Sequence, residues 1–196
     1  MLELKNIYKT FNPGTINEKV ALNGLNLTLN EGDFVTVIGG NGAGKSTMLN
    51  AVAGTWQVDE GQIIIDGIDV TKLSEHKRAA YLGRVFQDPM TGTAATMGIE
   101  ENLALAKRRG KTRLLKPGIT KKEREEYKEL LKVLGLGLED RLTSKVGLLS
   151  GGQRQALTLL MATLQKPKLL LLDEHTAALD PGTAEKVLNL TKRIVE

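Results

Sequence analysis

The most chemically specific stretch of the sequence is GGNGAGKST, which runs from Gly39 to Thr47. It matches the pattern G-x-x-x-x-G-K-[ST], and it lies between an apolar β-type run and a helix-forming run, as that pattern requires. Glycines let successive backbone N–H groups curl around phosphate oxygens without Cβ clashes. The Lys45 ammonium can reach the β- and γ-phosphates, and the Ser46 hydroxyl can bind Mg²⁺. The segment predicts a nucleotide-phosphate site made of Gly39, Gly40, Asn41, Gly42, Ala43, Gly44, Lys45, Ser46 and Thr47.

A second stretch, LLLLDEH, ends an apolar run in two carboxylates. Strand ends of this kind place charge at the carboxyl edge of an α/β sheet, where ligands bind. Asp173 is the expected Mg²⁺ ligand, and Glu174 can polarise a water aimed at the γ-phosphorus. The alternative is an acidic pair that faces solvent. We interpret His175 and His76 as surface histidines rather than catalytic groups.

A third stretch, LLSGGQRQ, precedes a helical pattern. Ser150 and Gln153 have the spacing of a capping box, which by itself indicates a well-formed helix start. Bare backbone amides at a helix N-terminus also attract anions, so the same residues can bind a phosphate. The residue pattern leaves open which molecule carries that phosphate.

The composition of the 196 residues sets limits on the class of protein. A hydrophobic content of 41% and a charged content of 26% are ordinary for a globular protein with one substantial core. The absence of cysteine excludes disulfides and thiolate zinc sites, and fits a reducing compartment. The N-terminus has no apolar signal-peptide region, and no apolar run approaches membrane-spanning length.

The net charge of +4 is concentrated in one segment. Between residues 107 and 122 the chain has no acidic residue, and its basic residues are Lys107, Arg108, Arg109, Lys111, Arg113, Lys116, Lys121 and Lys122. A solvated face, an anionic lipid or protein partner, and nucleic acid can each explain such a segment. No aromatic residue is interleaved for base stacking, which argues against nucleic acid.

The elements that must position these groups alternate between strand and helix patterns, as in an α/β domain. Strands are predicted at Leu2–Ile7, Val20–Leu29, Phe34–Ile38 (a central strand), Leu82–Phe86 and Lys168–Leu172, with a hairpin in GQIIIDGIDV that turns at Asp66-Gly67. A helix is predicted after the capping box of Thr120 and Glu123, and another after Ser150. The residues between Asp88 and Gln165 therefore form a helical insertion between two strands.

In their order along the chain, GGNGAGKST, LLSGGQRQ and LLLLDEHTAALD resemble the motifs of the nucleotide-binding domain of ATP-binding-cassette (ABC) proteins. The resemblance covers the whole chain. It implies an α/β fold: a P-loop NTPase core with a small antiparallel β-subdomain and an inserted α-helical signature subdomain. The implied boundaries are 1–87 for the core with the β-subdomain, 88–165 for the signature subdomain, and 166–196 for the return to the core.

The resemblance also implies roles for single residues. Gln87 in VFQDP matches the Q-loop glutamine, a ligand of Mg²⁺ and of water, and Glu174 matches the hydrolytic glutamate. Residues 178–180 match the D-loop. Phe11 in YKTF matches the aromatic residue that stacks on adenine. In the alternative, Phe11 is a core residue and Tyr8 contacts the adenine.

In such proteins two domains pair head to tail, and each signature helix binds the γ-phosphate of the ATP held by the other domain. Ser150, Gly151, Gly152 and Gln153 would then act in trans. The implied cofactors are ATP and Mg²⁺, and the implied partners are a second copy of the chain, integral membrane permease subunits and, indirectly, an extracellular solute-binding protein. No nucleic-acid partner is expected, and the expected location is the cytoplasmic face of the cell membrane.

The C-terminal end of the chain departs from the family pattern. The chain ends at Glu196, before the strand and switch histidine that the family places after this point, so it resembles a truncated domain with impaired turnover.

Chromosome-organising relatives carry a long coiled coil before the signature, and translation-factor relatives carry two cassettes; neither feature is present. A bacterial importer subunit with amino-acid cargo is the expected function, and an exporter subunit or a nucleic-acid ATPase is the alternative.

Overall fold

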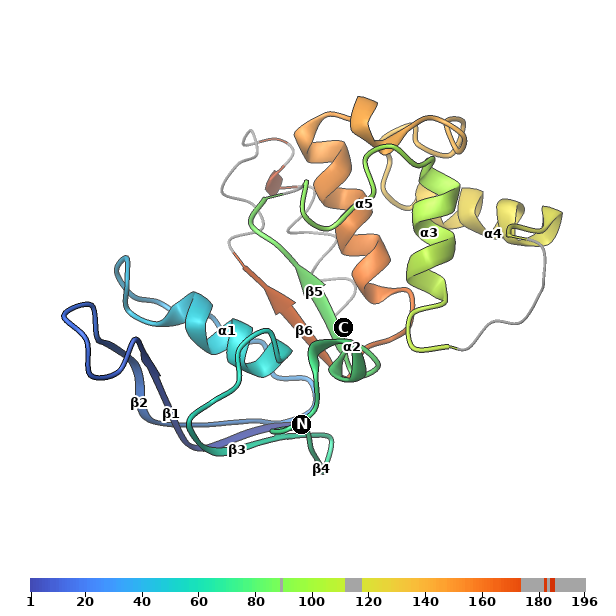
Figure 1. Ribbon diagram of the computed structural model, residues 1–196. Helices are drawn as coiled ribbons and strands as arrows, with labels where there is room; N and C mark the ends of the chain where they lie inside the picture. The colour runs from blue at the N-terminus through green and yellow to red at the C-terminus, as the bar shows by residue number, and fades with distance from the viewer. Residues whose placement is uncertain (89, 112–117, 174–181, 183, 186–196) are drawn as a thin grey trace. The chain divides into compact units, whose positions relative to one another are not determined.

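The structure is a computed structural model that describes residues 1–88, 90–111, 118–173, 182, 184 and 185 (Figure 1). The chain divides into two units, Met1–Leu82 and Gly83–Glu196, and each unit is described by itself. In the described ranges, no helix is both long enough and apolar enough to cross a membrane.

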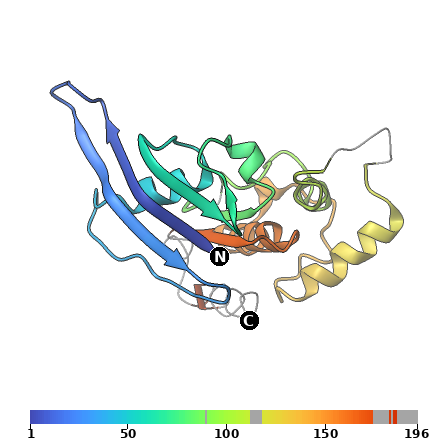
Figure 2. The same ribbon diagram turned by 90° about the horizontal axis from the view of Figure 1, so that it is seen from below.

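An antiparallel sheet with the strand order β2-β1-β3-β4 forms the base of the first unit. Its strands are β1 (Leu2–Phe11), β2 (Lys19–Leu29), β3 (Glu60–Ile65) and β4 (Ile68–Asp69). Figure 2 shows β1 and β2 as a long paired ribbon. Leu2 and Leu4 alternate with less buried neighbours and point into the core, which is why the period-two pattern of the sequence predicts the strand. The antiparallel β-subdomain is confirmed.

The turn between β3 and β4 has the predicted sequence Asp66-Gly67. Both residues have positive φ angles, 52° at Asp66 and 78° at Gly67. A two-residue hairpin turn whose central residues both have φ above zero matches the right-handed twist of its strands. The predicted hairpin is therefore confirmed.

Helix α1 (Lys45–Ala53) packs on this sheet through Met48 and the small residues of its last turn. Its C-terminal end is held by Arg78, the last residue of α2 (Glu75–Arg78). The Arg78 guanidinium is fully buried and donates to the carbonyl oxygens of Ala51 (2.6 Å) and Val52 (3.0 Å) in α1. A cation at a helix C-terminus complements the helix dipole, and these bonds replace the lost hydration.

The predicted central strand at Phe34–Ile38 is wrong in the structure. These residues form no regular secondary structure, and Phe34 is 61% and Ile38 is 90% exposed. A β-branched apolar run has the propensity for a strand, but a central strand also needs a hydrogen-bonded neighbour on each side. None of the described strands pairs with this segment.

In the second unit, β5 (Leu82–Val85), which begins at the boundary of the units, pairs with β6 (Leu169–Leu172). The helices are α3 (Ile99–Lys107), α4 (Lys121–Lys132), η1 (Val146–Leu148, a 3₁₀ turn) and α5 (Gly151–Thr163). Figure 1 shows α3 alongside α5. The helical insertion between two strands is thus present, although the sequence reasoning did not single out α3. The exact three-part boundaries stay a prediction.

The core of this unit is built from the apolar faces of the helices. Tyr127 and Leu131 of α4 and Leu157 of α5 are fully buried, as their spacing along each helix predicts. The capping box that starts α4 is also confirmed, since Glu123 N donates to Thr120 Oγ1 and Thr120 N donates to Glu123 Oε2.

Candidate nucleotide-binding site

The glycine-rich loop leads directly into α1, as the motif predicts. Gly44 is the N-cap of α1 and has a φ of 90°, a conformation that side chains with a Cβ rarely adopt. A Cβ atom at Gly44 would also lie 2.6 Å from the carbonyl oxygen of Ala21. No side chain caps this end of α1. The first-turn amides of α1 therefore have no side-chain acceptor, which makes this end suitable for an anion.

Lys45 lies at the same end of α1, and its side chain folds back over the loop. Its ammonium donates to the carbonyl oxygens of Gly39 (2.7 Å) and Gly40 (3.2 Å). The ammonium is thus held above the backbone that the motif assigns to the phosphates. Asn41 and Ser46 are exposed beside it. The structure therefore brings the predicted phosphate-binding residues together.

Phe11 lies at the end of β1 in the same unit. Its ring packs edge-on against Trp56, with ring centroids 4.9 Å apart. The ammonium of Lys9 lies 5.7 Å from the centre of the Phe11 ring and is paired with Asp59 at 2.7 Å. The hydrogen bond from Lys9 lowers the pKa of Asp59 below its ordinary value, and the Thr10 amide adds to this effect.

A residue that the sequence reasoning missed connects Phe11 with the phosphate loop. Lys19 pairs with Phe11 across the β1–β2 ladder. Its ammonium lies 3.4 Å from the position that a Cβ atom on Gly42 would take. The strand register between two patterned segments could have revealed this neighbour, but neither motif contains it.

Gln87 and Asp173 lie in the second unit, at neighbouring strand ends. Gln87 follows β5 by two residues, and Asp173 directly follows β6. The backbone N–H of Asp173 donates to the carbonyl of Val85 at 3.1 Å, so the two chain segments leave the sheet side by side. Gln87 is exposed and Asp173 is half-buried. The side-chain amide of Gln87 and the carboxylate of Asp173 thus lie at the same edge of the β5–β6 sheet. Both groups carry oxygen atoms that can bind Mg²⁺.

The signature residues form the start of α5. The Ser150 hydroxyl accepts a hydrogen bond from the Gln153 amide, and the Gln153 side chain accepts one from the Ser150 amide, both at 3.2 Å. The predicted capping box is therefore confirmed. Gly151 is exposed, with open space where a Cβ would stand, and Gly152 is half-buried. The first turn of α5 is accessible at Ser150 and Gly151.

Three predicted features lie outside the described residues: the hydrolytic Glu174, the surface His175 and the D-loop at 178–180. His76 is exposed, as expected.

Three cations of the basic segment, Lys107, Arg108 and Arg109, make contacts within their own unit. Lys107 pairs with Glu126 at 2.5 Å, and Arg108 pairs with Glu123 at 2.9 Å. Arg109 donates to the carbonyl of Ala162, and burial lowers the pKa of its guanidinium. These three cations serve contacts between α3, α4 and α5. Lys111, Lys121 and Lys122 are exposed, and Arg113 and Lys116 lie outside the described residues.

The loop, the strand ends and the fold define a P-loop nucleotide-binding protein of the α/β class. The family model of the ABC transporter matches residues 22–177. The chain belongs to the ABC transporter family, and it is an ATPase of that family that binds ATP.

Known proteins of the same family are similar over most or all of the chain. It is 46% identical over 200 residues to a tyrosine transport ATP-binding protein of Clostridioides difficile, covering all of this chain and 77% of that protein. It is 39% identical over 178 residues to the methionine import ATP-binding protein MetN of Rhizobium johnstonii, covering 89% of this chain and 46% of that protein. The chain thus spans less than half the length of this second relative.

Solved structures agree with the fold. A dimeric ATP-binding cassette in a post-hydrolysis state, bound to ADP and Pi, matches with a TM-score of 0.83 and 34% identity. The match covers all of this chain and 83% of that one. The expected P-loop NTPase core with its helical subdomain is therefore confirmed.

Proposed function

We propose that the protein is the ATP-hydrolysing subunit of a solute importer and that it works through ATP-driven, head-to-tail pairing of two copies. The observation that carries this proposal is the start of α1. Gly44 leaves the first-turn amides without a side-chain cap, and the Lys45 ammonium lies over the same loop. Amides and ammonium together favour a polyphosphate, because both interact with negative charge.

Mg²⁺ fits the residue types of the proposed site. Ser46, Gln87 and Asp173 would be its protein ligands, in the roles of a hydroxyl, an amide oxygen and a carboxylate. Each of them is an oxygen ligand, and magnesium in such sites takes its other ligands from phosphate and water. When bound there, the ion would neutralise the negative charge that develops on the phosphates during transfer.

The remaining roles follow the sequence motifs. Glu174 would polarise the attacking water, and Lys45 would hold the β- and γ-phosphates. Phe11 would stack on adenine, and its edge contact with Trp56 supports that role because it fixes the ring orientation. Ser150, Gly151, Gly152 and Gln153 would bind the γ-phosphate held by the second copy. ATP would then join the two copies, and hydrolysis would release them.

The membrane partners and the cargo are part of the proposal, and the similarity to known relatives supports them. The similarity to transport and import ATP-binding proteins supports permease subunits as partners, at the cytoplasmic face of the membrane, and a solute-binding protein outside. An amino acid, with tyrosine as the first candidate, is the proposed cargo. ATP hydrolysis by the reconstituted transporter should rise with a tyrosine-loaded binding protein and should not rise with spermidine.

A dimerisation experiment tests the proposed function directly. The Glu174→Gln variant should become dimeric in light scattering when ATP and Mg²⁺ are added, because it binds ATP but hydrolyses it slowly. With ADP it should stay monomeric. A variant that binds ATP and stays monomeric at high protein concentration would contradict the proposal.

A further inference from the structure

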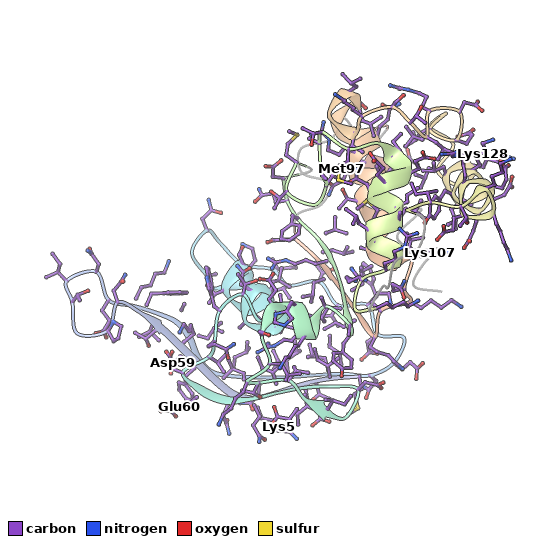
Figure 3. The ribbon with its side chains drawn as sticks, turned by 45° about the vertical axis from the view of Figure 1, so that its right-hand side comes forward. Lys5, Asp59, Glu60, Met97, Lys107 and Lys128 are labelled. Atoms are coloured by element: carbon purple, nitrogen blue, oxygen red, sulfur yellow. The ribbon has the colours of Figure 1, made fainter. Side chains whose placement is uncertain are left out.

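Asn102, on the buried side of α3, holds the loop that precedes this helix. Its side chain is 1% exposed. Its Oδ1 accepts from the Ala94 amide at 2.8 Å, and its Nδ2 donates to the carbonyls of Ala94 (3.1 Å) and Gly98 (2.9 Å). One carboxamide thus satisfies backbone groups at both ends of residues 94–98, which we call the Asn102 loop. Figure 3 marks Met97 in this loop, next to the first turn of α3.

The Asn102 loop binds the segment that leads to the signature residues. The Val146 amide donates to the Met97 carbonyl at 3.0 Å, and the Gly147 amide donates to the Ala95 carbonyl at 2.8 Å. The fit is close, because a Cβ atom on Gly147 would lie 2.9 Å from the Ala95 oxygen. The Asn102 loop therefore supplies the backbone acceptors that hold residues 146 and 147.

Residues 146 and 147 in turn fix the start of α5. The Leu149 amide donates to the Val146 carbonyl at 3.1 Å. The buried guanidinium of Arg154 donates to the carbonyls of Val146 (3.2 Å) and Gly147 (3.1 Å). The contacts run without a gap from Asn102 to the residue before Ser150.

We infer that Asn102 is a positioning residue for the signature helix: it fixes the Asn102 loop, and through Val146 and Gly147 it holds Ser150 ready for the phosphate of a second copy. The inference rests on the proposed function, because it assigns a purpose to the signature in trans. A positioning role requires no contact of Asn102 with the nucleotide or with the second copy.

The physical reason is the cost of ordering a loop at the moment of pairing. Without the carboxamide, the Ala94 amide loses its side-chain acceptor, and the Ala94 and Gly98 carbonyls each keep a backbone donor but lose the second one. The loop then gains other conformations. A binding surface that is ordered only part of the time binds with a correspondingly lower apparent affinity. Nucleotide binding by the monomer should change little, because the phosphate loop lies in the other unit.

The test compares Asn102→Ala and Asn102→Asp with the parent, all in the Glu174→Gln background. Asn102→Asp keeps the acceptor for Ala94 but cannot donate to the two carbonyls. For Asn102→Ala, dimer affinity in ATP should fall about tenfold or more, a typical size for coupling between sites. Asn102→Asp should lose at least as much, because a buried carboxylate oxygen would face the carbonyl oxygens of Ala94 and Gly98. Titration of monomer with ATP should show an affinity within about twofold of the parent, as expected for independent sites.

Hydrogen exchange gives a readout that does not depend on dimerisation. The amides of Val146 and Gly147 should exchange faster in Asn102→Ala, because their acceptors lie in the Asn102 loop. Gly147→Ala provides a second variant, since its Cβ would push against the Ala95 oxygen and open the same junction. Gly118→Ala is the matched control, because its Cβ would meet open space.

The outcomes separate the two proposals. If the parent does not dimerise with ATP, the proposed function fails; unchanged exchange at Val146 and Gly147 in Asn102→Ala would then overturn the inference on its own. If the parent dimerises, normal dimer affinity in both Asn102→Ala and Gly147→Ala would overturn it. A folding failure of Asn102→Ala leaves Gly147→Ala to decide.

Discussion

The ammonium of Lys45 lies 2.7 Å from the carbonyl oxygen of Gly39, six residues earlier in the chain. The lysine therefore reaches from the helix end of the loop back to its first residue and brings a positive charge over the exposed backbone between them. In a phosphate site of this type, such a charge belongs close to the β- and γ-phosphates.

Lys45→Ala should lower the affinity for ATP. The change removes one or two charge-assisted contacts with phosphate, each worth about 1.5–3 kcal/mol, so we expect a loss of about tenfold or more. Calorimetric titration measures it. Lys5→Ala is the control, because Lys5 pairs with Glu3 on β1. Equal ATP affinity in Lys45→Ala and the parent would remove Lys45 from the site.

Gly44→Ala should destabilise the first unit. A Cβ atom there combines an unfavourable φ of 90° with a 2.6 Å approach to the Ala21 oxygen. Left-handed backbone strain alone costs about 1–3 kcal/mol. Gly40→Ala is the matched control, since its Cβ would meet open space and its φ is not in that region. Urea unfolding of both variants checks the difference, and equal midpoints would contradict the strain argument.

Arg78→Leu should destabilise the same unit strongly. The buried guanidinium serves the carbonyls of Ala51, Val52, Leu73 and Thr71. Leaving such buried acceptors without a donor costs about 1–3 kcal/mol for each affected group. Lys77→Leu, at the exposed neighbouring position, should change the unfolding free energy little. A similar loss in both variants would show that α1 does not depend on this contact.

The α4 capping box should make the stability of the second unit depend on pH. Hydrogen bonding to the Thr120 amide holds the pKa of Glu123 below its ordinary value of 4.5, with the Thr120 hydroxyl and Arg108 contributing. Because the folded pKa is depressed, the stabilisation is complete above pH 4.5 and is lost as the pH falls through the folded pKa.

Glu123→Gln isolates this effect, because glutamine can still form the cap but does not titrate. The difference in unfolding free energy between the parent and Glu123→Gln should favour the parent at pH 7. It should shrink as the acid range is entered. A difference that grows on acidification would contradict the assigned direction.

Much of the fold and the site could be predicted because each rests on a local pattern. The Asp66-Gly67 turn, the capping boxes at Thr120 and Ser150, and the phosphate loop before α1 all depend on residues within a few positions of one another. Phe34–Ile38 shows the limit, since a strand depends on partners elsewhere in the chain.

The positions that the sequence reasoning missed are those whose contacts are distant in the chain. Arg78 reads as one more basic residue of an exposed helix, yet it is buried against α1. The roles of Asn102 and Lys19 likewise depend on distant contacts. Asn102 bonds to the backbone of Ala94, and the Lys19 ammonium lies near Gly42. No motif spacing records such pairings.

The central claim is that the signature helix of one copy serves the phosphate held by another, and Ser150→Arg in the Glu174→Gln background tests it most directly. Ser150 is exposed at the start of α5, so its own unit has room for a larger side chain. We predict that this side chain blocks the approach of a second copy and leaves ATP binding by the monomer unchanged. Light scattering with ATP and Mg²⁺ should show dimers for Glu174→Gln and monomers for the double variant, with ATP titration giving similar monomer affinities for both. Dimers of the double variant that persist in ATP would contradict the account.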